Sequence, residues 1–251
     1  MACPADSGRV DRVADSDCVV LGAIMRVACI IQARLGSARL PRKILADLHG
    51  KPLLAHVIER AQAIKGVTQV IVAVPMPDYA EISEAVGEGV AICAPNTDGA
   101  DVLGRYLAVA ESVHADVIMR VTGDCPLLDN HLAEQVLNLY QKLADPYIIA
   151  VNDTNLSGLP DGTDVEVFSM QALQAASACT RDPFCREHVT TWLREELPNY
   201  GILAPRGQAI TGAKWSVDSL EDLARVRTIM SQLEAGQFGW RETAKAWRRM
   251  T

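Results

Sequence analysis

The chain has 251 residues, of which 49% are hydrophobic and 5% aromatic, and it carries a formal net charge of −7. A chain of this size and composition can bury a sizeable core, which predicts one α/β domain with a small appendage. The acidic balance excludes a sequence-independent nucleic-acid binder, so any polyanion site must be a local group of basic residues that takes a small ligand. No apolar run reaches the roughly 18 to 20 residues that span a bilayer, so we expect no membrane partner.

Residues 1–24 lack the basic start and the long apolar core of a signal peptide. Their Ala, Asp, Ser and Gly content predicts a flexible N-terminal extension, with Met25 as a candidate start. The seven cysteines form no CxxC pair and no zinc spacing with histidine, which excludes a disulfide framework and a structural zinc site. This cysteine usage predicts a cytoplasmic protein.

Apolar, β-branched runs alternate with amphipathic stretches along the remaining chain, which is typical of βαβ units and a mostly parallel sheet flanked by helices. The predicted strands are Val27–Gln32, Val70–Val74, Val90–Cys93, Val117–Val121, Tyr147–Val151 and Lys214–Val217. The predicted helices are Pro52–Ala63, Tyr79–Val86, Val102–Val113, Asn130–Lys142, Cys185–Glu196 and Leu220–Leu233. Ligands of such sheets bind beyond the carboxyl ends of the strands, so the segments after Gln32, Val121 and Val217 are candidate site regions.

A cationic turn follows the first strand. It contains two small residues and four cations, which are Gly36, Ser37, Arg34, Arg39, Arg42 and Lys43. These cations and the exposed backbone N–H groups between them could converge on one polyanion. A solvated surface loop has the same composition, so the turn alone leaves both interpretations open. The absence of GxGxxG and GxxxxGK[ST] after a strand excludes dinucleotide-binding and P-loop sites.

Two aspartates follow two other predicted strands. Asp124 comes after a Thr-Gly pair at the end of one strand, and Asp218 directly follows Lys214–Val217. Magnesium prefers oxygen ligands, typically one or two carboxylates with substrate phosphates, so Asp124 and Asp218 are candidate ligands for Mg²⁺. The alternative at the second position is that Asp218 or Ser219 only caps the following helix.

Several motifs together resemble those of known enzymes. The motifs similar to those of the CMP-sugar synthetases are Gln32-Ala33-Arg34-x-Gly36-Ser37-x-Arg39-Leu40-Pro41-x-Lys43, Thr122-Gly123-Asp124-x-Pro126 and Trp215-x-Val217-Asp218. Three further motifs are similar to those of a cytidylyltransferase-like branch that is named for spore-coat polysaccharide biosynthesis. This branch is related to the 3-deoxy-manno-octulosonate and acylneuraminate cytidylyltransferases. The three motifs are Asp98-x-x-Asp101-Val102-Leu103-x-Arg105-Tyr106, Pro160-Asp161-Gly162-x-Asp164-Val165-Glu166-Val167 and Arg186-Glu187-His188-Val189-Thr190. The resemblance runs from about Met25 to Met230.

The resemblance implies a nucleotide-diphospho-sugar transferase fold that binds CTP with Mg²⁺, transfers CMP to an acidic sugar or related small acceptor, and releases pyrophosphate. An in-line attack on the α-phosphorus needs positioning and charge neutralisation rather than a covalent intermediate. The candidate catalytic residues are therefore Arg34, Lys43, Asp124 and Asp218. The candidate nucleotide-binding residues are Gln32, Ala33, Arg34, Gly36, Ser37, Arg39, Lys43, Thr122 and Gly123.

Acceptor recognition is expected to involve the part of the chain after residue 151. Asp164 and Glu166 alternate with valines after a turn, which predicts that both carboxylates share one face of a strand. The candidate acceptor-binding residues are Arg105, Asp161, Asp164, Glu166 and His188. The resemblance further implies a single domain over residues 25–251 and a homodimer, with an acceptor and dimer insertion at about 152–205.

Other functions stay open at this point. A glycosyltransferase of the same broad fold usually carries Asp-x-Asp at a strand end, whereas Asp15-x-Asp17 lies in the extension. A nucleotidyltransferase with another nucleotide or a non-sugar acceptor could use the same clamp, since the preference for CTP follows from the resemblance alone. A catalytically idle relative is the third alternative. Arg42 departs from the motif, where relatives usually carry glycine, and it could add a phosphate contact or restrict the loop.

Overall fold

The computed structural model describes residues 25–152, 157–210, 212–234 and 239–250, so the predicted extension over 1–24 lies outside the described residues. The strands are β1 (Val27–Gln32), β2 (Asp47–Leu48), β3 (Lys51–Pro52), β4 (Gln69–Ala73), β5 (Ala91–Cys93), β6 (Val117–Thr122), β7 (Ile149–Val151), β8 (Glu166–Ser169) and β9 (Asn199–Gly201). The α-helices are α1 (Leu53–Gln62), α2 (Tyr79–Val86), α3 (Val102–Ser112), α4 (Asn130–Leu143), α6 (Met170–Cys179), α7 (Pro183–Glu187), α8 (Thr191–Glu196), α9 (Leu220–Ser231) and α10 (Trp240–Arg248).

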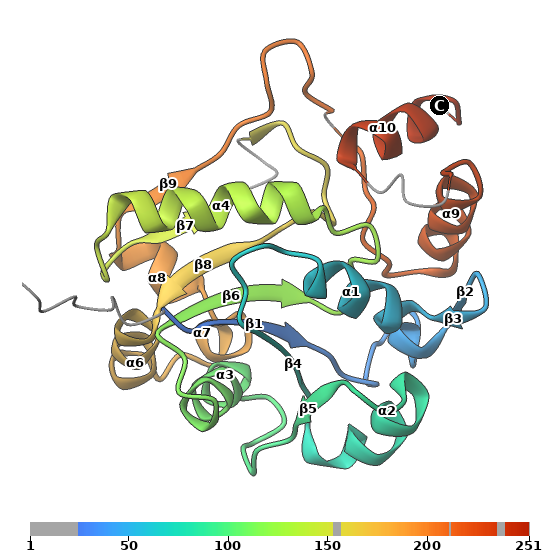
Figure 1. Cartoon of the computed structure of the whole chain (residues 1–251). Helices are drawn as coiled ribbons and strands as arrows, with labels where there is room; N and C mark the ends of the chain where they lie inside the picture. The colour runs from blue at the N-terminus through green and yellow to red at the C-terminus, as the bar shows by residue number, and fades with distance from the viewer. Residues whose placement is uncertain (1–24, 153–156, 211, 235–238, 251) are drawn as a thin grey trace, which may run out of the picture.

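One large sheet organises the described part of the chain. Its seven strands run in the order β5-β4-β1-β6-β8-β7-β9, with helices against both faces (Figure 1). The pairs on the β5 side of β6 are parallel, and β7 also pairs in parallel with β9. The predicted α/β fold with a mostly parallel sheet is confirmed. In these residues, no helix has the length and apolar character needed to cross a membrane.

The central strand β1 explains the layered core. Val27, Cys29 and Ile31 belong to one buried cluster, whereas Ala28 and Ile30 belong to the cluster on the opposite face. Successive side chains of a strand point to opposite faces, so a continuous apolar run is suited to a position between two helical layers. The run also aligns the site, because Gln32 at the end of β1 pairs with Thr122 at the end of β6.

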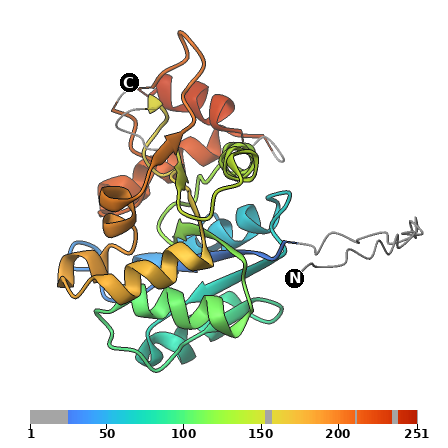
Figure 2. The same ribbon diagram turned by 90° about the vertical axis from the view of Figure 1, so that its left-hand side faces the viewer.

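The segment predicted as an insertion contributes to this same sheet. Strand β8 pairs antiparallel with both β6 and β7, and β9 forms the edge beyond β7. Figure 2 shows the orange-yellow helix α6 beside the green helix α3 under one face of the sheet. Residues of both helices enter one buried cluster, so this segment is packed into the main core rather than attached to it.

Two predicted elements are wrong. The predicted helix Cys185–Glu196 is divided into α7 and α8, because Val189 between them has a φ of 55°. The interruption lets the Thr190 hydroxyl donate to the buried carboxylate of Glu166. The predicted strand Lys214–Val217 is not a strand, since its backbone bonds go to loops: Trp215 N donates to Asp161 O, and Val217 N donates to Asp124 O.

Candidate active site

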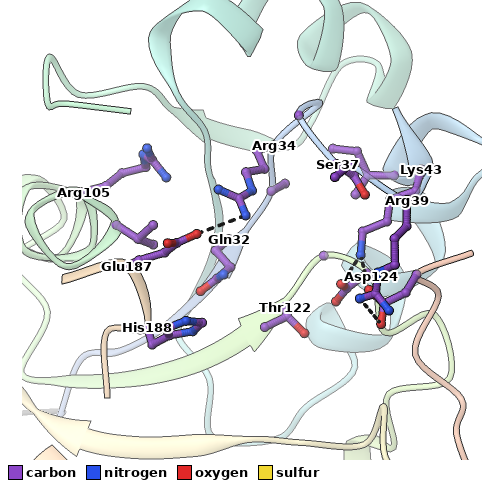
Figure 3. Close-up of a pocket in the computed structure, with 17 residues that line it drawn as sticks. Gln32, Arg34, Ser37, Arg39, Lys43, Arg105, Thr122, Asp124, Glu187 and His188 are labelled. Atoms are coloured by element: carbon purple, nitrogen blue, oxygen red, sulfur yellow. Dashed lines mark hydrogen bonds and ion pairs between the residues drawn. The ribbon is translucent and has the colours of Figure 1, made fainter. Parts of the chain in front are cut away.

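A pocket of about 370 Å³ lies where the segments after β1 and β6 meet the start of α9 (Figure 3). It is lined by Gln32, Ala33, Arg34, Gly36, Ser37, Ala38, Arg39, Lys43, Ile44, Val102, Arg105, Thr122, Gly123, Asp124, Glu187, His188 and Asp218. Every candidate nucleotide-binding residue and both candidate metal ligands are therefore brought together. The parallel register of β1 and β6 accounts for this, because it places the cationic turn beside the Thr-Gly-Asp segment.

Lys43 lies between the two predicted metal-binding carboxylates. Its Nζ is 2.5 Å from Oδ2 of Asp124 and 2.9 Å from Oδ1 of Asp218, and 13% of its side chain is exposed (Figure 3). Burial opposes the charge of Lys43, but the two carboxylates outweigh it and raise the pKa of the ammonium. The result is a compact group with one cation held by two anions.

Asp218 accepts from further cations on the outer side. Lys214 Nζ lies 3.0 Å and Arg39 Nη2 lies 3.0 Å from its Oδ2. Burial opposes its ionisation, but the hydrogen bonds from Lys43 and Lys214 hold the pKa of Asp218 at about 2. Its carboxylate is therefore ionised throughout the physiological pH range.

At the start of α9, one residue caps the helix and the residue before it lines the pocket. Ser219 is the N-cap and forms a capping box with Asp222, so capping does not require the Asp218 side chain. Asp222 Oδ2 accepts from the backbone N–H groups of Asp218 and Ser219 and from Lys214 Nζ. Lys214 and Asp222 thus hold Asp218 in place, a role that sequence analysis did not foresee.

The oxygen atoms of Asp124 and Asp218 suit a magnesium ion whose other ligands come from a bound substrate. Two carboxylates already converge on one cation, and Mg²⁺ is commonly bound by one or two carboxylates with substrate phosphates. Within the described residues, no three or more His, Cys, Asp and Glu side chains gather into a metal cage. Phosphate oxygens and water molecules would supply the remaining ligands.

Arg42 does not line the pocket, so the structure does not bring it to the expected phosphate position. Its φ of 61° lies in the left-handed region that favours glycine, which is the residue expected at this position of the motif. Its guanidinium forms an ion pair with Glu81 of α2. The loop is also held by Leu35, whose backbone N–H donates to Asp78 Oδ2 at 2.8 Å.

The other end of the pocket is formed by α3 and α7. Arg34 Nη2 lies 3.3 Å from Oε1 of Glu187, next to His188 (Figure 3). Arg105 is only 2% exposed, and its Nη2 donates to Gly99 O at 2.8 Å. Burial lowers the pKa of Arg105, and the neighbouring charge of Arg34 acts in the same direction. Glu187 was not among the candidate residues, although its place beside His188 in a motif was a usable signal.

Three candidate acceptor-binding residues lie outside the pocket lining. Asp161 accepts from the Ser216 hydroxyl at 3.1 Å, and Asp164 accepts from the backbone N–H of Gly162 at 3.0 Å. Glu166 is 4% exposed and is ion-paired inside the protein. Because β8 begins at Glu166, the two carboxylates do not share a strand as expected. An acceptor contact by any of the three stays a prediction.

Asp164 should make stability depend on pH. Burial raises its pKa to about 7, so between about pH 4 and pH 7 the native state holds a proton that the unfolded chain has released. Stability therefore falls as the pH rises through this window. Asp164→Asn keeps an oxygen for Gly162 N–H and should be roughly 1–3 kcal/mol more stable than the wild type at about pH 8. Urea unfolding across pH measures this, and parallel pH curves for the two proteins would contradict it.

Gly162 allows the 160–162 turn to approach the segment that leads to Asp218. Its φ is +95°, and a Cβ there would lie 2.5 Å from Ser216 N and 2.7 Å from Trp215 C. Gly162→Ala should lower the free energy of unfolding by about 2–4 kcal/mol, combining backbone strain with overpacking. Gly207→Ala is the matched control, since its φ is +77° with nothing within 4 Å, and it should cost about 1 kcal/mol. Equal losses in chemical unfolding would refute the close-approach explanation.

Comparisons with known proteins identify relatives of this chain. The sequence model of the family described as Cytidylyltransferase matches residues 28–235. The chain is 33% identical over 223 residues to 8-amino-3,8-dideoxy-manno-octulosonate cytidylyltransferase of Shewanella woodyi, covering 84% of this chain and 87% of the relative.

Solved structures share the fold. A cytidylyltransferase from Leptospira borgpetersenii serovar Hardjo-bovis superposes with a TM-score of 0.82 at 24% identity, covering 90% of this chain and 95% of the other. A CMP:2-keto-3-deoxy-manno-octonic acid synthetase solved with CTP superposes with a TM-score of 0.60 at 22% identity, covering 82% and 99%.

Proposed function

The chain belongs to the cytidylyltransferase family, and we propose from this premise that it transfers CMP from CTP to a sugar acid, releases pyrophosphate and uses Mg²⁺. The observation that carries the proposal is the cationic turn facing Asp124 and Asp218 in one pocket. A triphosphate needs several cations, and a metal needs the two carboxylates, so the two sets together suit a metal–nucleotide complex.

In this proposal the basic residues bind the triphosphate and the two aspartates bind the metal. Arg34, Arg39 and Lys43 bind the triphosphate and offset its charge as the pyrophosphate leaves, which keeps the α-phosphorus aligned for attack. Asp124 and Asp218 would hold a magnesium ion, which would supply Lewis-acid chemistry for the phosphoryl transfer. Lys43 now occupies the position between the two carboxylates, so it would have to turn toward the phosphates if a metal bound to the same oxygens.

The acceptor in this proposal is an acid because positive charge remains beyond the triphosphate clamp. Arg105 is buried in the lining, close enough to Arg34 for the two charges to interact. Arg105 forms no ion pair with another described residue, and a guanidinium in that situation suits a carboxylate. The name of the relative in Shewanella woodyi supports an octulosonate-type sugar acid as this acceptor.

Pyrophosphate release tests the proposal directly. The purified chain is incubated with CTP, UTP, ATP or GTP and with an octulosonate-type sugar acid or a neutral hexose, in magnesium or in EDTA. We expect release only with CTP, the acid and magnesium. Release with the neutral hexose would overturn the acceptor class, equal use of UTP would overturn the nucleotide, and full activity in EDTA would overturn the metal.

A cytoplasmic homodimer with contacts in residues 152–205 stays a prediction. Light scattering on the purified chain measures its molar mass, and a mass of one chain at working concentration would contradict the dimer.

A further inference from the structure

Gln32 is the last residue of β1 and lies in the pocket wall between Arg34 and Thr122 (Figure 3). Its Oε1 accepts a hydrogen bond from Nε of Arg120 at 3.2 Å. A guanidinium only donates hydrogen bonds, so the amide must turn its oxygen, and not its NH₂ group, toward Arg120. Within the described residues, the Nε2 of Gln32 has no acceptor and is left for a ligand.

Arg120 cannot move away easily because it is held from the opposite side. Its Nη1 lies 2.5 Å from Oε2 of Glu166, and the two side chains are 17% and 6% exposed. Glu166 also accepts from the Thr190 hydroxyl at 2.9 Å and from Nε of Arg194 at 2.7 Å. Breaking this buried ion pair would cost free energy, because it would leave an unpaired charge inside the protein. The amide orientation of Gln32 is thus set by a network outside the pocket.

We propose that Arg120 is a positioning residue that holds Gln32 with its NH₂ group toward the substrate, and that Gln32 selects a ligand atom that accepts a hydrogen bond. This inference rests on the proposed function. Two ligand groups share the required chemistry: the O2 and N3 atoms of cytosine, and the carboxylate oxygens of the sugar acid. A ligand that presents an N–H group at this position, as uracil does at N3, leaves two donors facing each other.

Gln32→Glu is the most informative variant. A carboxylate can still accept from Arg120, so the contact with the network is kept, but an oxygen replaces the NH₂ group that faces the ligand. We expect about a 100-fold fall in kcat/KM, which appears in the KM of one substrate. A higher KM for CTP alone identifies cytosine as the ligand group, and a higher KM for the sugar acid alone identifies the carboxylate. Wild-type KM values for both substrates would overturn the inference.

Arg120→Lys tests the positioning role. A lysine can keep the ion pair with Glu166 but lacks the Nε–H that meets Gln32, so we expect about a 10-fold rise in the same KM with little change in Tm. Arg26→Lys is the matched control, because Arg26 pairs with Asp116 at the amino ends of β1 and β6, and it should leave both KM values unchanged. Equal effects of the two lysine variants on KM would overturn the positioning role.

Calorimetry separates this inference from the proposed function. A wild-type chain that releases no pyrophosphate from CTP fails the proposed function. CTP and the sugar acid can still be titrated separately into the wild type and Gln32→Glu. A weaker Kd for one of them in the variant supports the role of Gln32, and equal affinities for both, or no binding by the wild type, overturn it.

Discussion

Asp124→Asn and Asp218→Asn should each lower kcat for pyrophosphate release by about 10³-fold or more while leaving the fold intact. Both carboxylates converge on one cationic position, at 2.5 Å and 2.9 Å from Lys43 Nζ. Asparagine has nearly the same shape but no charge, so it weakens the hold on a metal without emptying the space. Initial rates at several magnesium concentrations measure the effect, and part of the loss should be recovered at high magnesium.

Asp116→Asn is the matched control for these variants. Asp116 is a half-exposed carboxylate paired with Arg26. The two residues precede β6 and β1, so they lie at the amino ends of these strands, whereas the pocket lies at the carboxyl ends. It should retain wild-type turnover, and Tm should report that all three variants are folded. A fully active Asp124→Asn, Asp218→Asn double variant would sink the metal site, because no charge would remain at the two positions proposed to hold the ion.

Lys43→Met should weaken CTP binding by about 100-fold and lower kcat/KM by about 10³-fold, because it removes a cation from the triphosphate clamp. Lys43→Met should strengthen metal binding when no nucleotide is present. Without the ammonium, Asp124 and Asp218 lose the cation that lies between them, while Lys214 and Arg39 still pair with Asp218 on its outer side. Mn²⁺ as a probe should therefore bind at least about 10-fold more tightly than to the wild type. Calorimetric titrations with CTP and with Mn²⁺ measure the two effects separately.

Lys51→Met is the control for this pair of effects. Lys51 is half-exposed and paired with Glu59 on the surface, and it does not line the pocket. Neither titration should change in this variant. If Lys43→Met kept wild-type affinity for CTP, Lys43 would be a structural counter-ion only, and its assignment to the triphosphate would be lost.

Apart from the short strands β2 and β3, which were not predicted, the elements between residues 27 and 151 were well predicted because their signals are local. A continuous apolar run can be buried on both faces only inside a sheet, and β1 has the predicted bounds, Val27–Gln32. Helix α2 also has the predicted bounds, Tyr79–Val86. After residue 151 the local signals conflict with tertiary contacts. The break at Val189 and the non-strand segment at 214–217 are stabilised by bonds to Glu166, Asp161 and Asp124, which are distant in sequence.

The contacts of the Glu166 side chain also could not be predicted from the local sequence. Alternation with valines gave it a strand position, and β8 does begin there. The pattern could not show that Arg120 and Arg194 would surround its carboxylate, because ion pairs of this kind depend on how β6, β8 and α8 pack. The consequence for function is large, since Glu166 supports Arg120 behind the pocket rather than lining it.

The sequence by itself determined the family, the layered α/β core, and the chemistry available at the ends of β1 and β6. These depend on residue types at short spacing, which a linear pattern records. Only the tertiary structure decided that Lys43 lies between Asp124 and Asp218, which are 81 and 175 positions away along the chain. It also decided that Arg120 turns the amide of Gln32. Such contacts follow from strand register and from the packing of α9 against the loops, because folding brings together side chains that no local pattern relates.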